Sequence, residues 1–161
     1  DISLQKLEQL DGRGGLNDFV FGLAFMPNPT KKILATSDSA GLIAIWDLDQ
    51  CKPKAVSNSQ LKLNELSCVP IDSWQDESKN PIRTLAFSED NKLLISGGDD
   101  GQVIVWHLTP TYGLDKTKSQ EGKGDTIYRS YKKINSIGLK NNREIIVISG
   151  GEDSQVEFKK Y

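Results

Sequence analysis

Short apolar runs recur along the chain in groups of three, separated by turn-forming residues. The runs are four to six residues long and rich in Ile, Val and Leu, and Gly, Asp, Asn and Pro bound them. This pattern is typical of β-strands. Several runs are apolar throughout instead of alternating, which predicts strands that are covered on both faces. No segment carries an apolar stripe with the period of a helix, so we expect an all-β protein.

The groups of three runs align with one another as repeated units. Phe25 and Trp46 lie 21 residues apart in the first unit, and Phe87 and Trp106 lie 19 apart in the second. Because Asp accepts backbone hydrogen bonds and Gly tolerates positive φ, the Asp and Gly residues between the second and third runs predict tight hairpin turns. The three units cover approximately residues 18–48, 81–108 and 132–161.

Three strings in these units resemble the WD-repeat β-propeller family. They are SGGDDGQVIVW at 96–106, IAIWD at 43–47, and LAFSEDN at 85–91, which resembles the family's first strand and its following turn. The resemblance implies propeller blades, each a four-stranded antiparallel sheet, with three blades in this chain. Residues 1–161 would then form one partial WD-repeat propeller.

The resemblance implies four strands per blade, and the three runs of each unit supply only three of them. The fourth strands are expected in the connections, near residues 66–72 and 125–130. Residues of approximately 3–10 would form the fourth strand of a neighbouring blade, so the chain would start on a fourth strand and end on a third. The segments left over, about 49–64 and 109–124, are polar and are predicted to be mobile surface loops.

Blades of this family often contain a hydrogen-bonded set of His, Ser or Thr, Asp and Trp. No unit of this chain has the full set: Ser78 stands where the His of the second unit is expected, and Lys159 where the Trp of the third unit is expected. We therefore expect blades with fewer polar contacts, held together mainly by apolar packing. The structural blade positions that the resemblance assigns are Thr36, Trp46, Ser96, Asp100, Trp106, Ser149 and Asp153.

Three blades do not close a ring, because propellers typically have 4–8 blades. Two apolar blade faces would be exposed, and each is a predicted association site. Two interpretations stay open. The chain is a fragment that further blades of the same full-length chain complete, which the missing initiator Met favours, or two copies assemble into a six-bladed ring.

Composition and charge argue against several classes of protein. Lys and Arg total 20 and Asp and Glu total 22, and this balance gives no support to a nucleic-acid or anionic-membrane partner. No apolar run approaches the roughly 20 residues that span a bilayer, and no signal peptide is visible. Cys51 and Cys68 form neither a disulfide framework nor a zinc motif, so we expect two incidental thiols in a reducing compartment. A cytoplasmic location follows as the expectation.

No residue pattern predicts catalysis, a metal site or a cofactor. Residues 122–125, GKGD, lack the Ser or Thr and the earlier Gly of a phosphate-binding loop. His107 is the only histidine and has no nucleophile beside it in sequence, and adjacent turn residues such as Asp99 and Asp100 point apart. The chain is therefore predicted not to be an enzyme.

The resemblance implies a protein-interaction scaffold that binds protein or peptide with the top face of the propeller. In the family, partner contacts cluster where first strands begin and in the turn before each third strand. Phe19 and Phe21 could be interface anchors or could pack into the blade, and both interpretations stay open. The alternatives are a sensor or regulatory repeat region of a larger signalling protein, attached to an NTPase or protease module, and, third, an enzyme on a propeller scaffold. The candidate partner-binding residues are Phe19, Phe21, Ser39, Pro81, Arg83, Asp99, Lys133, Asn135 and Glu152.

Overall fold

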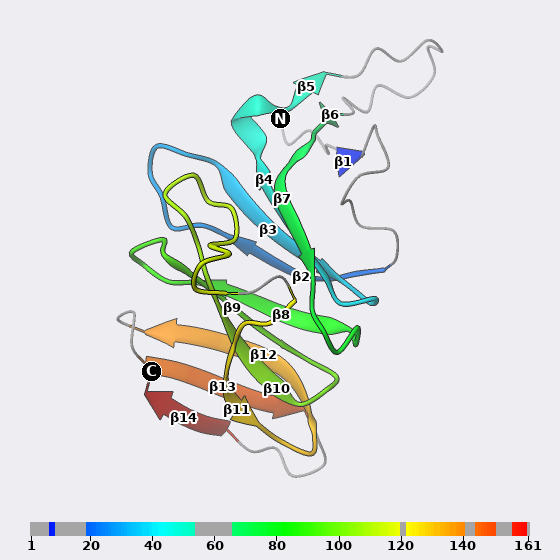
Figure 1. Cartoon of the computed structure of the whole chain (residues 1–161), viewed down its shortest axis with the longest axis vertical. Helices are drawn as coiled ribbons and strands as arrows, with labels where there is room; N and C mark the ends of the chain where they lie inside the picture. Colours follow the sequence, from blue (N-terminus) through cyan, green and yellow to red (C-terminus); the bar gives the residue numbers. More distant parts are fainter. Residues whose placement is uncertain are drawn as a thin grey trace, which may run out of the picture.

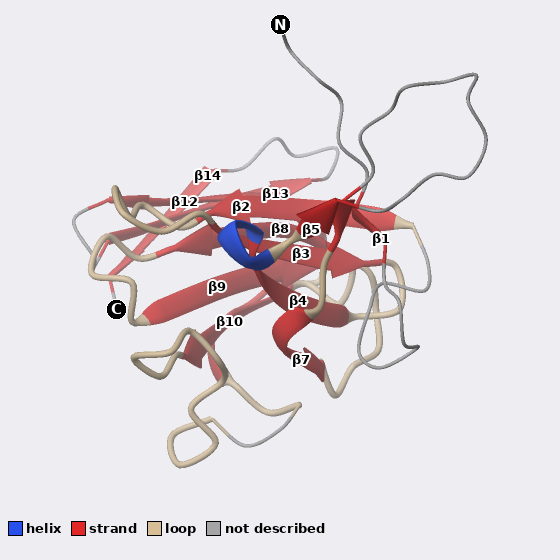
Figure 2. Cartoon of the chain, turned by 90° about the horizontal axis from the view of Figure 1, so that it is seen from above, coloured by secondary structure: helices blue, strands red, loops and turns tan. Residues whose placement is uncertain are grey.

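The computed structural model of the chain describes residues 7–8, 19–53, 66–119, 122–140, 144–150 and 156–160. The regular structure of these segments is β-strand apart from one 3-10 turn, η1 (Leu48–Gln50), drawn in blue in Figure 2. The all-β prediction is therefore confirmed. No helix in the described segments is long and apolar enough to cross a membrane.

The first sheet has the strand order β2-β3-β4-β7, and all its pairings are antiparallel. Every residue of β3 is buried, so both faces of this strand are covered. The turn that follows is tight because Asp38 Oδ1 accepts hydrogen bonds from the backbone N–H groups of Ala40 and Leu42, both at 2.9 Å, and Gly41 adopts a φ of 81°. The strands span Val20–Phe25, Ile33–Asp38, Leu42–Asp47 and Pro70–Gln75.

The second sheet repeats this architecture with β8, β9, β10 and β11. Its fourth strand occupies the predicted connection near 125–130. The fourth strand of the first sheet, β7, begins at Pro70, later than the predicted residue 66, because Leu66–Ser67 forms the separate short strand β6. Four-stranded antiparallel blades are thus confirmed for two units. The strands span Ile82–Phe87, Leu93–Gly98, Gln102–His107 and Asp125–Arg129.

The third sheet consists of β12 (Lys133–Lys140), β13 (Glu144–Gly150) and β14 (Val156–Lys160), paired antiparallel. Of the segment 3–10, the structure describes only β1 (Leu7–Glu8). This strand pairs in parallel with β6, which pairs antiparallel with β5 (Lys52–Pro53). The other residues of 3–10 lie outside the described segments, so their assignment to a neighbouring blade stays a prediction.

The three sheets are stacked face to face, from the blue first sheet through the green second to the orange third in Figure 1. Side chains of β10 show how the stack is built, because neighbouring residues point to opposite faces. Ile104 and Trp106 belong to the apolar cluster shared with the first sheet. In this cluster the ring centres of Trp106 and Trp74 lie 5.6 Å apart. Val103 and Val105 belong to the cluster shared with the third sheet. Apolar burial between the sheets therefore holds the stack together.

The connection between β10 and β11 is packed against the sheets and differs from the mobile loop predicted for 109–124. The backbone N–H of Leu114 donates to Asp72 Oδ2 at 2.9 Å, and Asn28 Nδ2 donates to the Tyr112 hydroxyl at 3.3 Å. Buried Ser119 accepts from the backbone N–H of His107 at 3.0 Å. The connection, yellow-green in Figure 1, thus reaches back from the second sheet to the first. In the other predicted loop, residues 54–64 lie outside the described segments.

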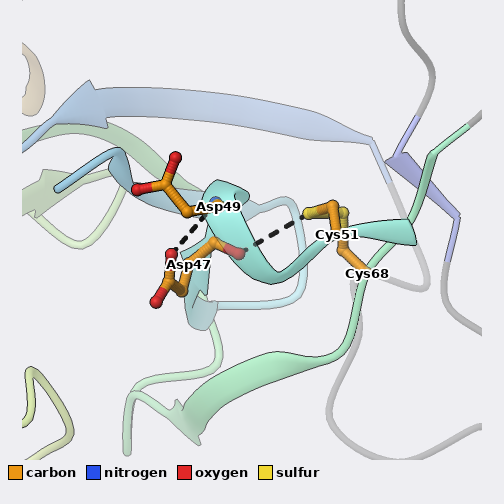
Figure 3. Close-up of a disulfide and its surroundings, with 4 residues drawn as sticks. All are labelled: Asp47, Asp49, Cys51 and Cys68. Atoms are coloured by element: carbon orange, nitrogen blue, oxygen red, sulfur yellow. Dashed lines mark hydrogen bonds between the residues drawn. A yellow bond between two sulfur atoms is a disulfide. The ribbon is translucent and has the colours of Figure 1, made fainter. Parts of the chain in front are cut away.

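Cys51 and Cys68 form a disulfide, so the expectation of two incidental thiols is wrong (Figure 3). Cys51 follows the turn η1 and Cys68 follows β6, and the pairing of β4 with β7 brings the two residues together. The buried Cys68 packs in an apolar cluster with Leu34 and Trp46. The two cysteines are 17 residues apart in the sequence, and this spacing does not predict a disulfide, because only strand pairing brings them together.

Candidate functional site

The first strands of the three sheets bring their starting ends to one edge of the stack. Strands β2 and β8 are in contact, and so are β8 and β12. In each sheet the start of the first strand pairs with the end of the second, as Ile82 does with Gly98. The turn before the third strand therefore lies at the same edge. We call this region the top edge: the starts of β2, β8 and β12, together with the turns at 39–41 and 99–101.

Four of the predicted partner-binding residues meet at the top edge. Arg83 makes two hydrogen bonds to the Asp99 carboxylate, from Nε to Oδ1 and from Nη2 to Oδ2, the second at 3.0 Å. Lys133 Nζ lies 2.7 Å from Asp99 Oδ2. On the other side, the Arg83 guanidinium carbon lies 5.2 Å from the centre of the Phe21 ring, a cation–π contact. We call these residues, which come from all three sheets, the top row.

Electrostatics keep the top row charged. The hydrogen bonds from Arg83 hold the pKa of Asp99 below its ordinary value, and Lys133 lowers it further against the opposing effect of burial. The same hydrogen bonds raise the pKa of Arg83. With two cations around one carboxylate, the top row carries one net positive charge. The Lys133 side chain is 54% exposed and the Asp99 side chain 15%, so the positive charge is the more accessible one.

The two aromatic residues at the start of β2 differ in exposure. Phe19 is 76% exposed, and its carbonyl oxygen accepts from the backbone N–H of Ser39 at 2.9 Å. Phe21 is 44% exposed, because Arg83 covers part of its ring. The Phe19 side chain is therefore largely exposed, and its role as an interface anchor stays a prediction.

The other predicted partner-binding residues do not join the top row. Ser39 lies in the turn, with its buried hydroxyl lacking a hydrogen-bond partner among the described residues. The Pro81 carbonyl accepts from the backbone N–H of Asp99 at 2.9 Å, which is a structural contact. Asn135 is exposed at the bulge of β12. Glu152 lies outside the described segments.

The blade positions carried over from the resemblance form only part of the family's set. Trp46 Nε1 donates to Thr36 Oγ1 at 2.8 Å, and Trp106 Nε1 donates to Ser96 Oγ at 2.9 Å, all four residues being buried. The Asp100 carboxylate instead accepts hydrogen bonds from the backbone N–H and the side-chain amide of Gln102. Ser78, in the expected His position, bonds Asp76. The Ser149 side chain and Asp153 lie outside what the structure describes.

Sequence reasoning missed two residues near these positions. Tyr131 is fully exposed in the turn just before Lys133, and an aromatic residue in a polar turn was a signal that could have found it. Asp76 is buried at the end of β7, although nothing in its sequence context predicts burial. Within the described segments, no three His, Cys, Asp or Glu side chains gather in a way that could hold a metal ion.

Comparison with known proteins bears on the same strands. Residues 68–107, which include β7 to β10, match the family model described as "WD domain, G-beta repeat". The chain is 32% identical over 80 residues to Polycomb protein esc of Musca domestica, a match that covers 50% of this chain and 16% of that relative. It is 29% identical over 99 residues to Transducin beta-like protein 3 of Bos taurus, which covers 62% of this chain and 10% of that relative.

A third relative is MST50-interacting protein 11 of Pyricularia oryzae, 26% identical over 100 residues, which covers 62% of this chain and 26% of the relative. The matched region is thus about a quarter or less of each of these three proteins. The matched repeat, these relatives and the stacked antiparallel sheets together support a WD-repeat family for this chain.

Proposed function

We propose that the chain is a non-catalytic scaffold that binds protein or peptide partners through the top edge of its blades. WD repeats are in general protein-interaction repeats, which fits this role. The observation that carries the proposal is the top row, in which Phe21, Arg83, Asp99 and Lys133 connect three sheets. Aromatic residues and Arg are enriched at the centres of protein interfaces, because they combine large contact area with directed polar groups.

The test compares partner capture by the full-length protein and by variants with altered surfaces. Phe19→Ala and Lys133→Ala each remove an exposed group at the top edge, so we expect both to lose partners from a quantitative affinity capture. Lys92→Ala is the matched control, because Lys92 is an exposed cation in the turn after β8, at the opposite edge. Equal loss in all three variants, or in none, would contradict the proposal.

The runner-up is a sensor or regulatory repeat region of a larger signalling protein, attached to an NTPase or protease module. It is supported by the length of the relatives, of which the matched region covers 10% to 26%. The full-length gene sequence separates the two functions, since the runner-up requires a catalytic module in the same chain. If the full-length chain contains a propeller and no catalytic module, the scaffold function is the one that remains.

The same proposal covers how the stack is completed. Leu23 and Phe25 on β2 are 58% and 62% exposed, on the face turned away from the second sheet. A further blade of the full-length chain or a second copy would bury this apolar face. Nucleic-acid and membrane partners are not part of the proposal. The cytoplasmic location stays a prediction, and the Cys51–Cys68 disulfide weighs against it, since disulfides persist mainly in oxidising compartments.

A further inference from the structure

A polar cavity of about 390 Å³ opens at the outer seam between the first and second sheets. Its walls are the turn after β7 at 76–78, the loop at 122–124 and the outer strands β10 and β11. No residue of the top row lines it. The volume lies within the range of about 300–1,000 Å³ that is usual for small-ligand sites.

The most buried charged group in the cavity wall is Asp76, which is 3% exposed. Its carboxylate accepts hydrogen bonds from the backbone N–H of Ser78 at 3.1 Å and from the Ser78 hydroxyl. Burial raises the pKa of Asp76 and the charge of Asp100 raises it further, while the Ser78 hydrogen bonds oppose the rise. No Lys, Arg or His of the described segments forms an ion pair with Asp76. A buried carboxylate without a cation is costly, which makes this one an attractor for positive charge.

The turn itself does not require this charge. The Asp76 side chain accepts from a backbone N–H two residues on, a role that the neutral side-chain oxygen of Asn fills equally well. The backbone of Asp76 is held independently, since its N–H donates to the Gly41 carbonyl and its carbonyl accepts from Lys79. The negative charge is therefore in excess of the structural role of the residue.

The walls around Asp76 are fixed before any ligand enters. The backbone N–H of Glu77 donates to the Gly122 carbonyl at 2.9 Å, and the Glu77 carboxylate lies 3.2 Å from Lys123 Nζ. Gln102 is oriented on the opposite wall, because its Nε2 donates to Asp100 and its Oε1 accepts from Thr126. Such a preformed wall lowers the entropic cost of binding.

We propose that this cavity binds a cationic side chain of a partner protein, with the charged end of the Arg or Lys against the Asp76 carboxylate. Lys123 does not oppose this cation, because Glu77 neutralises it. Arg129 also lines the cavity, but it is exposed and can turn toward solvent. An anionic ligand at Arg129 would instead bring a second negative charge toward buried Asp76. No residue of the top row lines this cavity, and the binding proposed here does not depend on the function proposed for the top edge.

The probes are N-acetyl-arginine amide and N-acetyl-lysine amide, with N-acetyl-citrulline amide as the uncharged control, titrated into the isotopically labelled full chain. We expect either cationic probe to shift the backbone amide signals of Ser78, Gly122 and Gly124 and the side-chain amide of Gln102. Citrulline has nearly the shape of arginine without its charge, so it should leave these signals in place. Equal shifts with citrulline, or no shift with either cation, would overturn the proposal.

Two variants of the same cavity complete the test. Asp76→Asn keeps the hydrogen-bond acceptor and should weaken binding of the cationic probe at least about tenfold, the loss of one charge-assisted contact. Arg129→Gln should bind the probe as tightly as the wild type or more tightly. The opposite result, with Arg129→Gln losing binding and Asp76→Asn retaining it, would show an anion site and refute the cation site. If Asp76→Asn failed to fold, the citrulline comparison and Arg129→Gln would still decide.

Discussion

Arg83 and Asp99 face each other across the pairing of β8 with β9, with Arg83 Nη2 3.0 Å from Asp99 Oδ2. Lys133 reaches the same carboxylate from the third sheet, so one aspartate links two sheets. Bidentate Arg–carboxylate pairs have well-defined geometry, unlike most surface ion pairs.

We expect the Arg83–Asp99 pair to contribute measurably to stability. A double-mutant cycle of Arg83→Ala and Asp99→Ala should give a coupling energy of about 1 kcal/mol, the upper end for partly exposed pairs. The measurement is urea denaturation of the four proteins. The pair of Lys32 with Asp49, whose Lys is 77% exposed, is the matched control and should couple more weakly. Equal coupling in the two cycles would contradict the prediction.

Two aspartates should change the acid dependence of stability in opposite directions. The pKa of Asp99 is below its ordinary value in the folded state, so its contribution is fully present above the ordinary value and is lost as the pH falls from there through the lower pKa of the folded state. The pKa of Asp76 is raised, so stability is lost as the pH rises from the ordinary carboxyl value through the higher pKa of the folded state, where the buried carboxyl ionises.

The check is the free energy of unfolding in urea between about pH 7 and pH 2. Asp99→Asn should reduce the loss of unfolding free energy in acid. Asp76→Asn should be more stable than the wild type near neutrality and equally stable in acid. Parallel pH profiles for the wild type and both variants would contradict this expectation.

The disulfide should stabilise the β4–β7 connection. For a closed loop of 17 residues, chain entropy predicts a loss of about 3 kcal/mol on reduction. Urea denaturation with and without dithiothreitol measures this loss, and the double variant Cys51→Ser with Cys68→Ser should not respond to the reductant. Two freely reacting thiols in the oxidised native protein would refute the pairing.

The Ser96 hydroxyl should matter more than its size suggests. Ser96→Ala leaves the buried Trp106 N–H without an acceptor, which costs about 1–3 kcal/mol. Ser39→Ala is the matched control, because the Ser39 hydroxyl is buried without a partner in the described part of the chain and its removal should be close to neutral. Chemical denaturation compares the two, and a larger cost for Ser39→Ala would contradict the assignment.

The exposed side of the first sheet should drive association of the isolated chain. Multi-angle light scattering should show a mass that rises with concentration, and Leu23→Ser with Phe25→Ser should lower it, because these side chains expose apolar surface. Phe19→Ser at the top edge is the control and should leave the mass unchanged. A sharp dimer would instead favour the six-bladed ring. A chain that stays monomeric at every concentration would contradict both.

Much of the candidate site could be predicted from the repeats, and part of it could not. Arg83 and Lys133 stand where the first strands of their units begin, and Asp99 stands in the turn before a third strand, so a stack of equivalent sheets had to bring these positions to one edge. The contact of Lys133 with Asp99 was beyond prediction, because side-chain contacts between sheets depend on how far each sheet is rotated on the next. The same holds for Asp76, whose burial depends on a loop about 45 residues further along the chain.

The periodicity of apolar residues was sufficient by itself to determine the strands, their grouping into units and the burial of β3, because strand formation and two-sided burial follow from local pattern. Tertiary structure alone decided that Cys51 meets Cys68, that Leu114 bonds Asp72 and that Asp76 lines a cavity. Each of these features brings together residues that lie far apart in the sequence, and no local sequence pattern predicts that they meet. They come together only when strands pair and sheets stack, and their positions are set by packing of the whole chain.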